Sequence, residues 1–471
     1  MSFFFHIVNF IDSFSAKLCS IIYFNILSIF GINNIDLPFI IALLLIGYIV
    51  LTFKLRFIQF TKLRYSIKYA FGKKKDKKEG DISSLKTLLA SVAGCTGMNA
   101  IAGMVFMVSI GGPGTAFWMP ILAFLCMPFR FAEVYLSHSY RGNNNGEVLG
   151  GPFDYIKKGL GSFNLKKLGV ILSFLYAFIM IFCGVTGLAM YETNQCVSVL
   201  ANSFSFLSNK KLLLSTIVTI VLLFILIGGT KRIIKMLSTV LPILAISYLV
   251  ASLIVIFVNI DKLWEAIVII CKDAIHPRAI AGGFLASLCM CARKVSLAHE
   301  TGLGTSGIVH ASSSEKDSIK EATSSMMTPL INCFCVCMMS ALVLVITGFY
   351  KDESTKDGAV AIFKAFGSVS SILPYLITIL IPMLAFNVLV GWSNYVIKCS
   401  KYCFKSRNVI DFIMILFLIS AFIGGNINDF NLIMQVVDGI MMLLIIINVP
   451  IIIALSGKVW KSIEKYNFKD K

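Results

Sequence analysis

Charged residues are scarce in this sequence. Only 14% of the 471 residues are Asp, Glu, Lys or Arg, whereas 57% are hydrophobic and the mean hydropathy is +0.85. A soluble domain usually has about a quarter charged residues, and the longest polar stretch here is only the segment near 54–86. The composition therefore excludes an ordinary soluble protein and predicts an all-α polytopic membrane protein.

Motifs of soluble catalysis and of metal binding are lacking as well. The five histidines form no HExxH pattern, and neither a GxSxG nor a Walker A sequence occurs. The thirteen cysteines contain no paired CxxC, and Cys333, Cys335 and Cys337 would lie on different faces of a helix. We predict no enzyme, no metal site and no cofactor, and we interpret the cysteines as packing residues.

Apolar runs long enough to cross about 30 Å of hydrocarbon occur eleven times. The seventh run is the unusual one, because it contains Arg293 and Lys294. The runs lie near residues 37–53, 87–110, 115–137, 168–190, 212–229, 236–258, 279–298, 330–349, 372–396, 409–425 and 433–455. We therefore expect about 11 transmembrane helices.

Basic residues gather on alternate connections between these runs. These connections contain 31 of the 42 Lys and Arg residues. They are 54–86, 130–167, 231–235, 316–320, 398–407 and the segment after 457. The positive-inside rule makes that side cytoplasmic, in a bacterial-type inner membrane, with the N-terminus outside and the C-terminus inside. The net charge of +18 thus reflects topology and predicts no nucleic-acid partner. The run 73–78 either faces solvent or contacts anionic membrane lipid.

Glycines interrupt two of the runs. SVAGCTGMNAIAGMVFMVSIGGPG at 91–114 contains Gly94, Gly97 and Gly103, and AGGF at 281–284 opens a second glycine-rich segment. Glycine inside a helix costs about 1 kcal/mol relative to alanine. The pattern predicts either close helix packing or a broken helix whose free backbone groups bind a carboxylate, an ammonium group or a cation.

The second glycine-rich run lies five crossings after the first. An odd number of crossings per repeat inverts the second half of the chain in the membrane, as in many secondary transporters. The N-terminal segment lacks signal-peptide features and is expected to lie at the outer interface. The predicted divisions are the tail 1–36, an extra helix 37–53, a basic loop 54–86, five-helix repeats 87–258 and 259–455, and a basic tail 456–471.

Several ordered motifs resemble those of the alanine or glycine:cation symporter family. They are LTFKLRFIQFTKL at 51–63, IAGMVFMVSIGGPGTAFWM at 101–119, FAE at 131–133, GEVLGGPFDYIKKGLG at 146–161, HETGLGTSGIVHA at 299–311, ALVLVITG at 341–348 and Gly391-Trp392-Ser393. The resemblance implies a LeuT-like 5+5 inverted repeat with one extra N-terminal helix. It also implies sodium-coupled symport of a small neutral amino acid such as alanine or glycine.

The resemblance also implies a set of site residues. The substrate would contact both broken helices and two others, the third and the eighth helix of the 5+5 repeat. The residues are Gly97, Asn99, Ala100, Gly103, Thr193, Gly282, Gly283, Phe284 and Trp392. The cation would lie near Gly94, Asn387 and Val388. Trp392 would cap the apolar side of the substrate.

Departures from the family pattern affect the coupling ion. Asn99 is displaced by one position, Val388 offers no hydroxyl where the family has threonine, and Asn332 replaces an aspartate. Sodium prefers oxygen ligands, so we expect its coupling to be weakened or replaced. His299 stands beside Glu300, and this pair either carries a proton or is structural.

Two other kinds of function stay open at this stage. One is a proton-coupled or uncoupled amino-acid carrier. The other is a degenerate, non-transporting paralogue that acts as a ligand sensor or scaffold. A membrane enzyme would need an acid–base or nucleophilic set of residues, which the sequence does not show.

Overall fold

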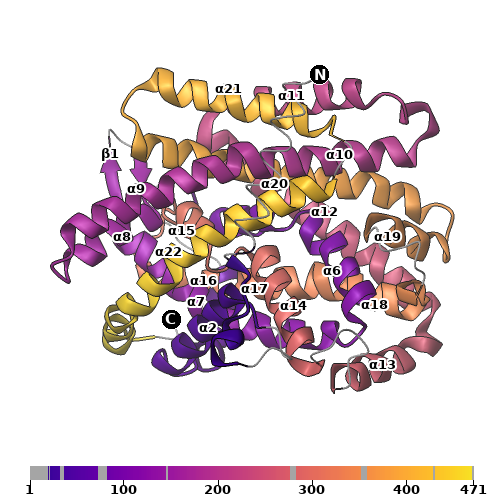
Figure 1. Ribbon diagram of the computed structural model, residues 1–471, viewed down its shortest axis with the longest axis horizontal. Coiled ribbons are helices and arrows are strands. Elements are labelled where there is room, and N and C mark those ends of the chain that lie inside the picture. Colours follow the sequence, from indigo (N-terminus) through magenta and orange to yellow (C-terminus); the bar gives the residue numbers. More distant parts are fainter. Residues whose placement is uncertain are drawn as a thin grey trace.

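The computed structural model describes residues 20, 22–31, 37–72, 82–144, 147–275, 283–351, 358–427 and 430–468. These parts of the chain are mostly helical (Figure 1). The described strands β1 (Gly142–Asn144) and β2 (Glu147–Leu149) form a short antiparallel hairpin in which Gly142 pairs with Leu149. The predicted all-α polytopic architecture is confirmed.

Seven described helical stretches are long and apolar enough to cross a membrane, judged by length and composition. They are Thr115–Ser139, Lys166–Ala201, Gly229–Val258, Ser318–Thr347, Leu373–Cys403, Arg407–Gly424 and Val437–Lys465. Three shorter apolar helices are α2 (Phe39–Lys54), α5 (Ser84–Cys95) and α11 (Lys211–Ile227). The number eleven stays a prediction.

Most of the long stretches consist of one helix each, but two contain a π-helical turn. The single helices are α7 (Thr115–Ser139), α12 (Gly229–Val258), α20 (Leu373–Cys403), α21 (Arg407–Gly424) and α22 (Phe430–Lys465). The others are α9 (Lys166–Phe182), η2 (Cys183–Leu188) and α10 (Ala189–Ser203), and α16 (Ser318–Ser325), α17 (Met327–Asn332), η5 (Cys333–Cys337) and α18 (Met338–Thr347). Single π-turns inside α-helices are frequent near functional sites.

Shorter elements connect these helices. They are η1 (Ile26–Phe30), α3 (Ile58–Thr61), α4 (Leu63–Phe71), α6 (Met98–Gly111), α8 (Pro152–Gly161), η3 (Ser205–Leu207), η4 (Ile260–Lys262), α13 (Leu263–Ile275), α14 (Gly283–His299), α15 (Thr305–His310), η6 (Phe349–Lys351) and α19 (Gly358–Gly367). Most of the predicted N-terminal tail and the basic run 73–78 lie outside the described residues.

Helix α20 runs through the middle of the molecule (Figure 1), where it packs against α5, α9, α10 and α12. Helix α2 packs against α7 and α22, and α14 packs against α6 and α7. The outer helices α11 and α21 expose large apolar side chains such as Phe224, Ile227 and Phe412. Such a surface suits contact with lipid, whereas the polar side chains of α20 are buried.

Candidate substrate and cation site

The first glycine-rich run is broken, which is one of the two alternatives that the sequence left open. Helix α5 ends at Cys95 and α6 begins at Met98. Between them, Thr96 (φ −92°, ψ 76°) and Gly97 (φ −119°, ψ −154°) leave the helical conformation. Since the first N–H groups of a helix have no partner inside it, the start of α6 presents donors and the positive end of a helix dipole.

Two other helices approach the backbone closely at Gly97. A Cβ atom there would lie 2.5 Å from Val388 Cγ2 of α20 and 3.2 Å from Glu192 Oε1 of α10. A side chain at this position therefore has no room. Gly97 is the point at which α6, α10 and α20 meet.

Gly94 has a different role from Gly97. A Cβ atom on Gly94 would lie 2.4 Å from the Tyr395 hydroxyl, and one on Gly391 would lie 2.9 Å from the Gly94 Cα atom. These contacts mark close packing of α5 against α20, which small residues permit. Of the two readings open for this run, packing accounts for Gly94 and the break accounts for Gly97.

Buried polar atoms without a hydrogen-bond partner occur on the helices that meet at Gly97. Within the described part of the chain they include Glu192 Oε2, Thr193 Oγ1 and both amide atoms of Asn387. Glu192 is 2% exposed, and Thr193 and Asn387 are fully buried. Buried polar groups are nearly always hydrogen-bonded, so these atoms are the ones that a ligand would satisfy.

The predicted second break, which opens at 281–284, lies largely outside the described residues, and a separate turn follows His299. Helix α14 runs without interruption from Gly283 to His299, and α15 begins at Thr305. Between them, Glu300, Gly302 and Gly304 adopt φ values of 52°, 97° and 95°. Left-handed backbone is uncommon for a residue with a side chain, so Glu300 is held there by its surroundings.

Side chains from four helices bind the backbone of residues 299–303. The donors to carbonyl oxygens and their distances are Arg130 Nη2 to His299, Tyr48 Oη to Thr301 (3.2 Å), Asn448 Nδ2 to Gly302 (2.8 Å) and Tyr176 Oη to Leu303 (2.5 Å). Glu133 Oε2 accepts from the Gly302 N–H at 3.3 Å. Side chains of the protein therefore bind much of the backbone of this turn.

Helix α20 connects the two interruptions. Trp392 lies one turn after Val388 on the same face, and its Nε1 donates to Glu300 Oε1 at 2.7 Å. Glu300 is also close enough to Glu192 for their charges to interact. Asn332 Nδ2 donates to the Ala298 carbonyl at 2.5 Å and lies 3.7 Å from Cys95 Sγ. Helix α20 thus contacts the break at Gly97 through Val388 and the turn after His299 through Trp392.

The structure brings part of the predicted set together. Gly97, Val388 and Asn387 lie at the break, Thr193 follows Glu192 in α10, and Ala100 and Gly103 are buried in the first turns of α6. Trp392 is fully buried against Glu300.

Some predicted residues are described only in part. Gly282 and the side chain of Asn99 lie outside the described residues. Gly283 and Phe284 begin α14, and only their backbone is described. His299 Nδ1 is buried without a partner in the described region, whereas Glu300 binds Trp392. The proposed proton site at His299 and Glu300 stays a prediction.

Glu192 is the residue that sequence reasoning missed. The predicted crossing ended at residue 190, but the helical stretch continues through α10 to Ser203 and carries Glu192 into the protein. The sequence could have pointed to Glu192 only because this carboxylate directly follows an apolar run. An ionisable residue inside a membrane helix is by default a candidate functional residue.

Comparisons with known proteins show which transporters the chain is similar to. A family model described as the sodium:alanine symporter family matches residues 25–471. An uncharacterized transporter of Haemophilus influenzae is 32% identical over 403 residues, covering 83% of this chain and 85% of that protein. A sodium/alanine symporter of Methanococcus maripaludis is 30% identical, covering 91% and 94%. An amino-acid carrier protein of Bacillus subtilis is 25% identical, covering 88% and 86%.

Proposed function

Because the chain belongs to the sodium:alanine symporter family, we propose that it is a secondary active transporter that takes up a small neutral amino acid together with a cation. Alanine or glycine is the proposed substrate and sodium the proposed coupling ion. The family and its relatives are transporters, and the chain is not an enzyme.

The proposed architecture is a LeuT-like pair of inverted five-helix repeats, 87–258 and 259–455, behind one extra helix. The tails and the loop 54–86 keep their predicted places, with the N-terminus outside and the C-terminus in the cytoplasm of a bacterial-type cell. The basic loops support this orientation. The two predicted broken helices, with breaks at Gly97 and at 281–284, would hold the substrate between them near the middle of the membrane.

One observation supports this function above the others: the helices that meet at Gly97 carry buried polar atoms for which the described residues offer no hydrogen-bond partner. The N–H groups at the start of α6 suit the substrate carboxylate. The Thr193 hydroxyl and the Asn387 amide oxygen suit a hard cation, as carboxylate and carbonyl oxygens do.

Glu192 supplies the negative charge that this site needs. Its Oε1 atom lies beside Gly97, and no Lys, Arg or His side chain pairs with it among the residues described here. An isolated buried carboxylate is costly, so a positive charge from the ligand would stabilise it. The positive group is the coupling ion or the substrate ammonium. Glu192 thereby compensates for the hydroxyl that Val388 does not offer.

A proton-coupled carrier is the second candidate. The observation that favours it is the same unpaired carboxylate, because a proton neutralises Glu192 as well as sodium does. A ligand sensor would bind an amino acid without transporting it, so only a transport assay distinguishes it from a carrier.

Counterflow in proteoliposomes tests these alternatives. The unmodified protein should exchange labelled alanine or glycine, and the rate should rise with external sodium. Glu192→Gln, which keeps the shape and removes the charge, should raise the half-saturating sodium concentration by about tenfold, which corresponds to roughly 1.4 kcal/mol. Glu265→Gln on the exposed surface of α13 is the matched control.

Each outcome decides between the candidates. A rate that follows the proton gradient and ignores sodium identifies the proton-coupled carrier. Binding without exchange identifies the sensor. Sodium dependence that is unchanged in Glu192→Gln would show that Glu192 does not hold the cation.

A further inference from the structure

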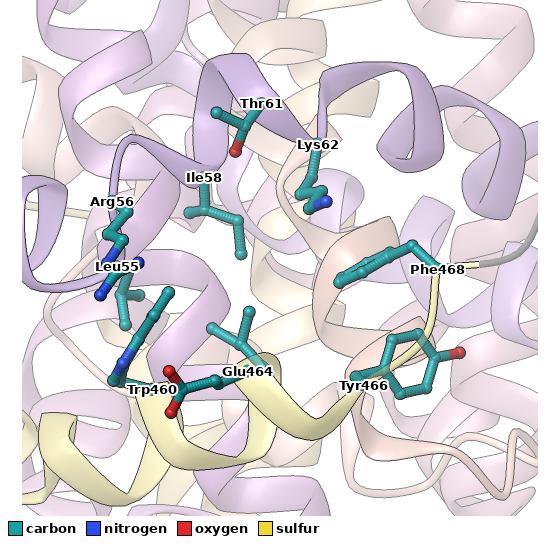
Figure 2. A pocket seen from close by; sticks show the side chains of 10 residues that line it. Leu55, Arg56, Ile58, Thr61, Lys62, Trp460, Glu464, Tyr466 and Phe468 are labelled. Carbon is teal, nitrogen blue, oxygen red and sulfur yellow. The ribbon is translucent and has the colours of Figure 1, made fainter.

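A pocket of about 330 Å³ lies away from the transport site, where α2 and α22 end. The turn after α2 supplies Arg56 and Lys62, and the end of α22 and the chain beyond it supply Trp460, Glu464 and Phe468 (Figure 2). Both helices are apolar until they reach this point. The pocket therefore lies at one boundary of the membrane.

Two cations of the pocket rest on aromatic rings. The Arg56 guanidinium carbon lies 4.5 Å from the centre of the Trp460 ring, and Lys62 Nζ lies 4.5 Å from that of Phe468. Across the described residues, neither cation makes an ion pair with a carboxylate. A guanidinium stacked on a ring keeps its N–H groups free in its own plane, where they can bind a phosphate in a bidentate manner.

The charge of the lining favours a single negative group. Arg56 and Lys62 contribute two positive charges and Glu464 contributes one negative charge, so one phosphodiester would neutralise the pocket. A zwitterionic headgroup would leave the net positive charge in place. Charge complementarity thus selects an anionic lipid over a zwitterionic one.

The backbone at Arg56 is unusual. Arg56 and Phe57 are consecutive non-glycine residues with φ values of 48° and 56°. Such conformations persist only where the surrounding structure holds them, and they cluster at ligand sites. This turn places Arg56 over Trp460 instead of letting α2 continue.

Exposed aromatic side chains border the pocket on the α2 side. Phe53, Phe57 and Phe60 are 64%, 42% and 59% exposed, and Phe53 and Phe57 contact each other edge to face. Aromatic side chains at the end of a membrane helix suit the interface between headgroups and acyl chains. The loop 54–86, which contains the turn, is the richest basic segment of the chain.

We propose that this pocket binds an anionic phospholipid, with the lipid phosphate between Arg56 and Lys62 and the acyl chains beside Phe53 and Phe57. The lipid belongs to the leaflet on the basic side of the protein. It fixes the turn after α2 to the end of α22.

Binding of short-chain lipids to the purified full-length chain in detergent tests the proposal. Native mass spectrometry should give a dissociation constant for dioctanoylphosphatidylglycerol at least about tenfold below that for dioctanoylphosphatidylethanolamine. Arg56→Gln with Lys62→Gln should remove this preference. Lys166→Gln with Lys167→Gln, at two exposed positions at the start of α9, removes the same charge and should leave it intact.

A second variant keeps the test decisive if the double variant does not fold. Glu464 is exposed near the end of α22, and Glu464→Gln removes the one carboxylate of the lining, so phosphatidylglycerol should bind more tightly. Unchanged or weaker binding in Glu464→Gln would overturn the proposal. Equal binding of the two lipids would also overturn it, as would inorganic phosphate binding as tightly as phosphatidylglycerol, which would identify a free-phosphate site.

Discussion

Replacing Gly97 by alanine should block the proposed site through a steric clash. The new Cβ atom would lie 2.5 Å from Val388 Cγ2, whereas ordinary van der Waals contacts begin at 3.4 Å, so α6 and α20 would have to separate by almost 1 Å. The φ value of Gly97 is −119°, which alanine adopts freely. The effect is therefore one of packing, and overpacking of this kind costs about 1–3 kcal/mol.

If the clash destabilises the substrate-bound state by this free energy, substrate binding should weaken by roughly fivefold to 150-fold. Binding is measured by scintillation proximity on purified protein, with Gly457→Ala as the control, because a Cβ at Gly457 meets nothing within 4 Å. Val388→Ala should restore binding in the Gly97→Ala background. Full binding in Gly97→Ala, or no rescue by Val388→Ala, would refute the proposed meeting of α6 and α20 at the ligand.

Three further predictions follow from the same contacts. Trp392→Phe should lower the free energy of unfolding by about 1–3 kcal/mol, because it leaves Glu300 without its 2.7 Å donor; thermal unfolding in detergent measures this. Val388→Thr should lower the half-saturating sodium concentration for uptake, since it adds an oxygen ligand beside Asn387. A reporter at the C-terminus should be cytoplasmic and one inserted near Asp352 external, as the basic loops predict.

Controls separate these effects from general damage. Trp264 is 74% exposed, so Trp264→Phe should leave the unfolding transition in place. Equal destabilisation by both tryptophan changes would argue against the bond to Glu300. Val388→Thr with an unchanged sodium response would place the ion elsewhere, and a cytoplasmic reporter at Asp352 would overturn the eleven-crossing topology.

The first break was predictable because its cause is local. Gly94 and Gly97 weaken the helix within one turn, and the structure places the break at Thr96 and Gly97. The break predicted at 281–284 stays a prediction. The turn after His299 could not be predicted, because it contains Glu300, a residue that local preference does not put in left-handed backbone.

The contacts of the site were beyond sequence reasoning because they are long-range. Glu192 becomes notable only when α10 is seen to carry it against Gly97, and its position in the sequence gave no sign of that neighbour. The pairing of Trp392 with Glu300 likewise depends on how α20 passes both interruptions. Periodicity and glycine content predict helices and their breaks, but the partners come from tertiary packing.

The hydrogen bonds around residues 300–304 affect how the protein is made. The Gly302 carbonyl accepts from Asn448, whose own amide oxygen accepts from Tyr155. During synthesis residues 300–304 leave the ribosome well before α22. The Gly302 carbonyl therefore lacks its Asn448 donor until α22 has been translated. Because the predicted seventh crossing ends at residue 298, water can satisfy this carbonyl until the last helix inserts. A ribosome stalled before α22 should therefore hold a chain in which Asn448 does not yet fix residues 300–304.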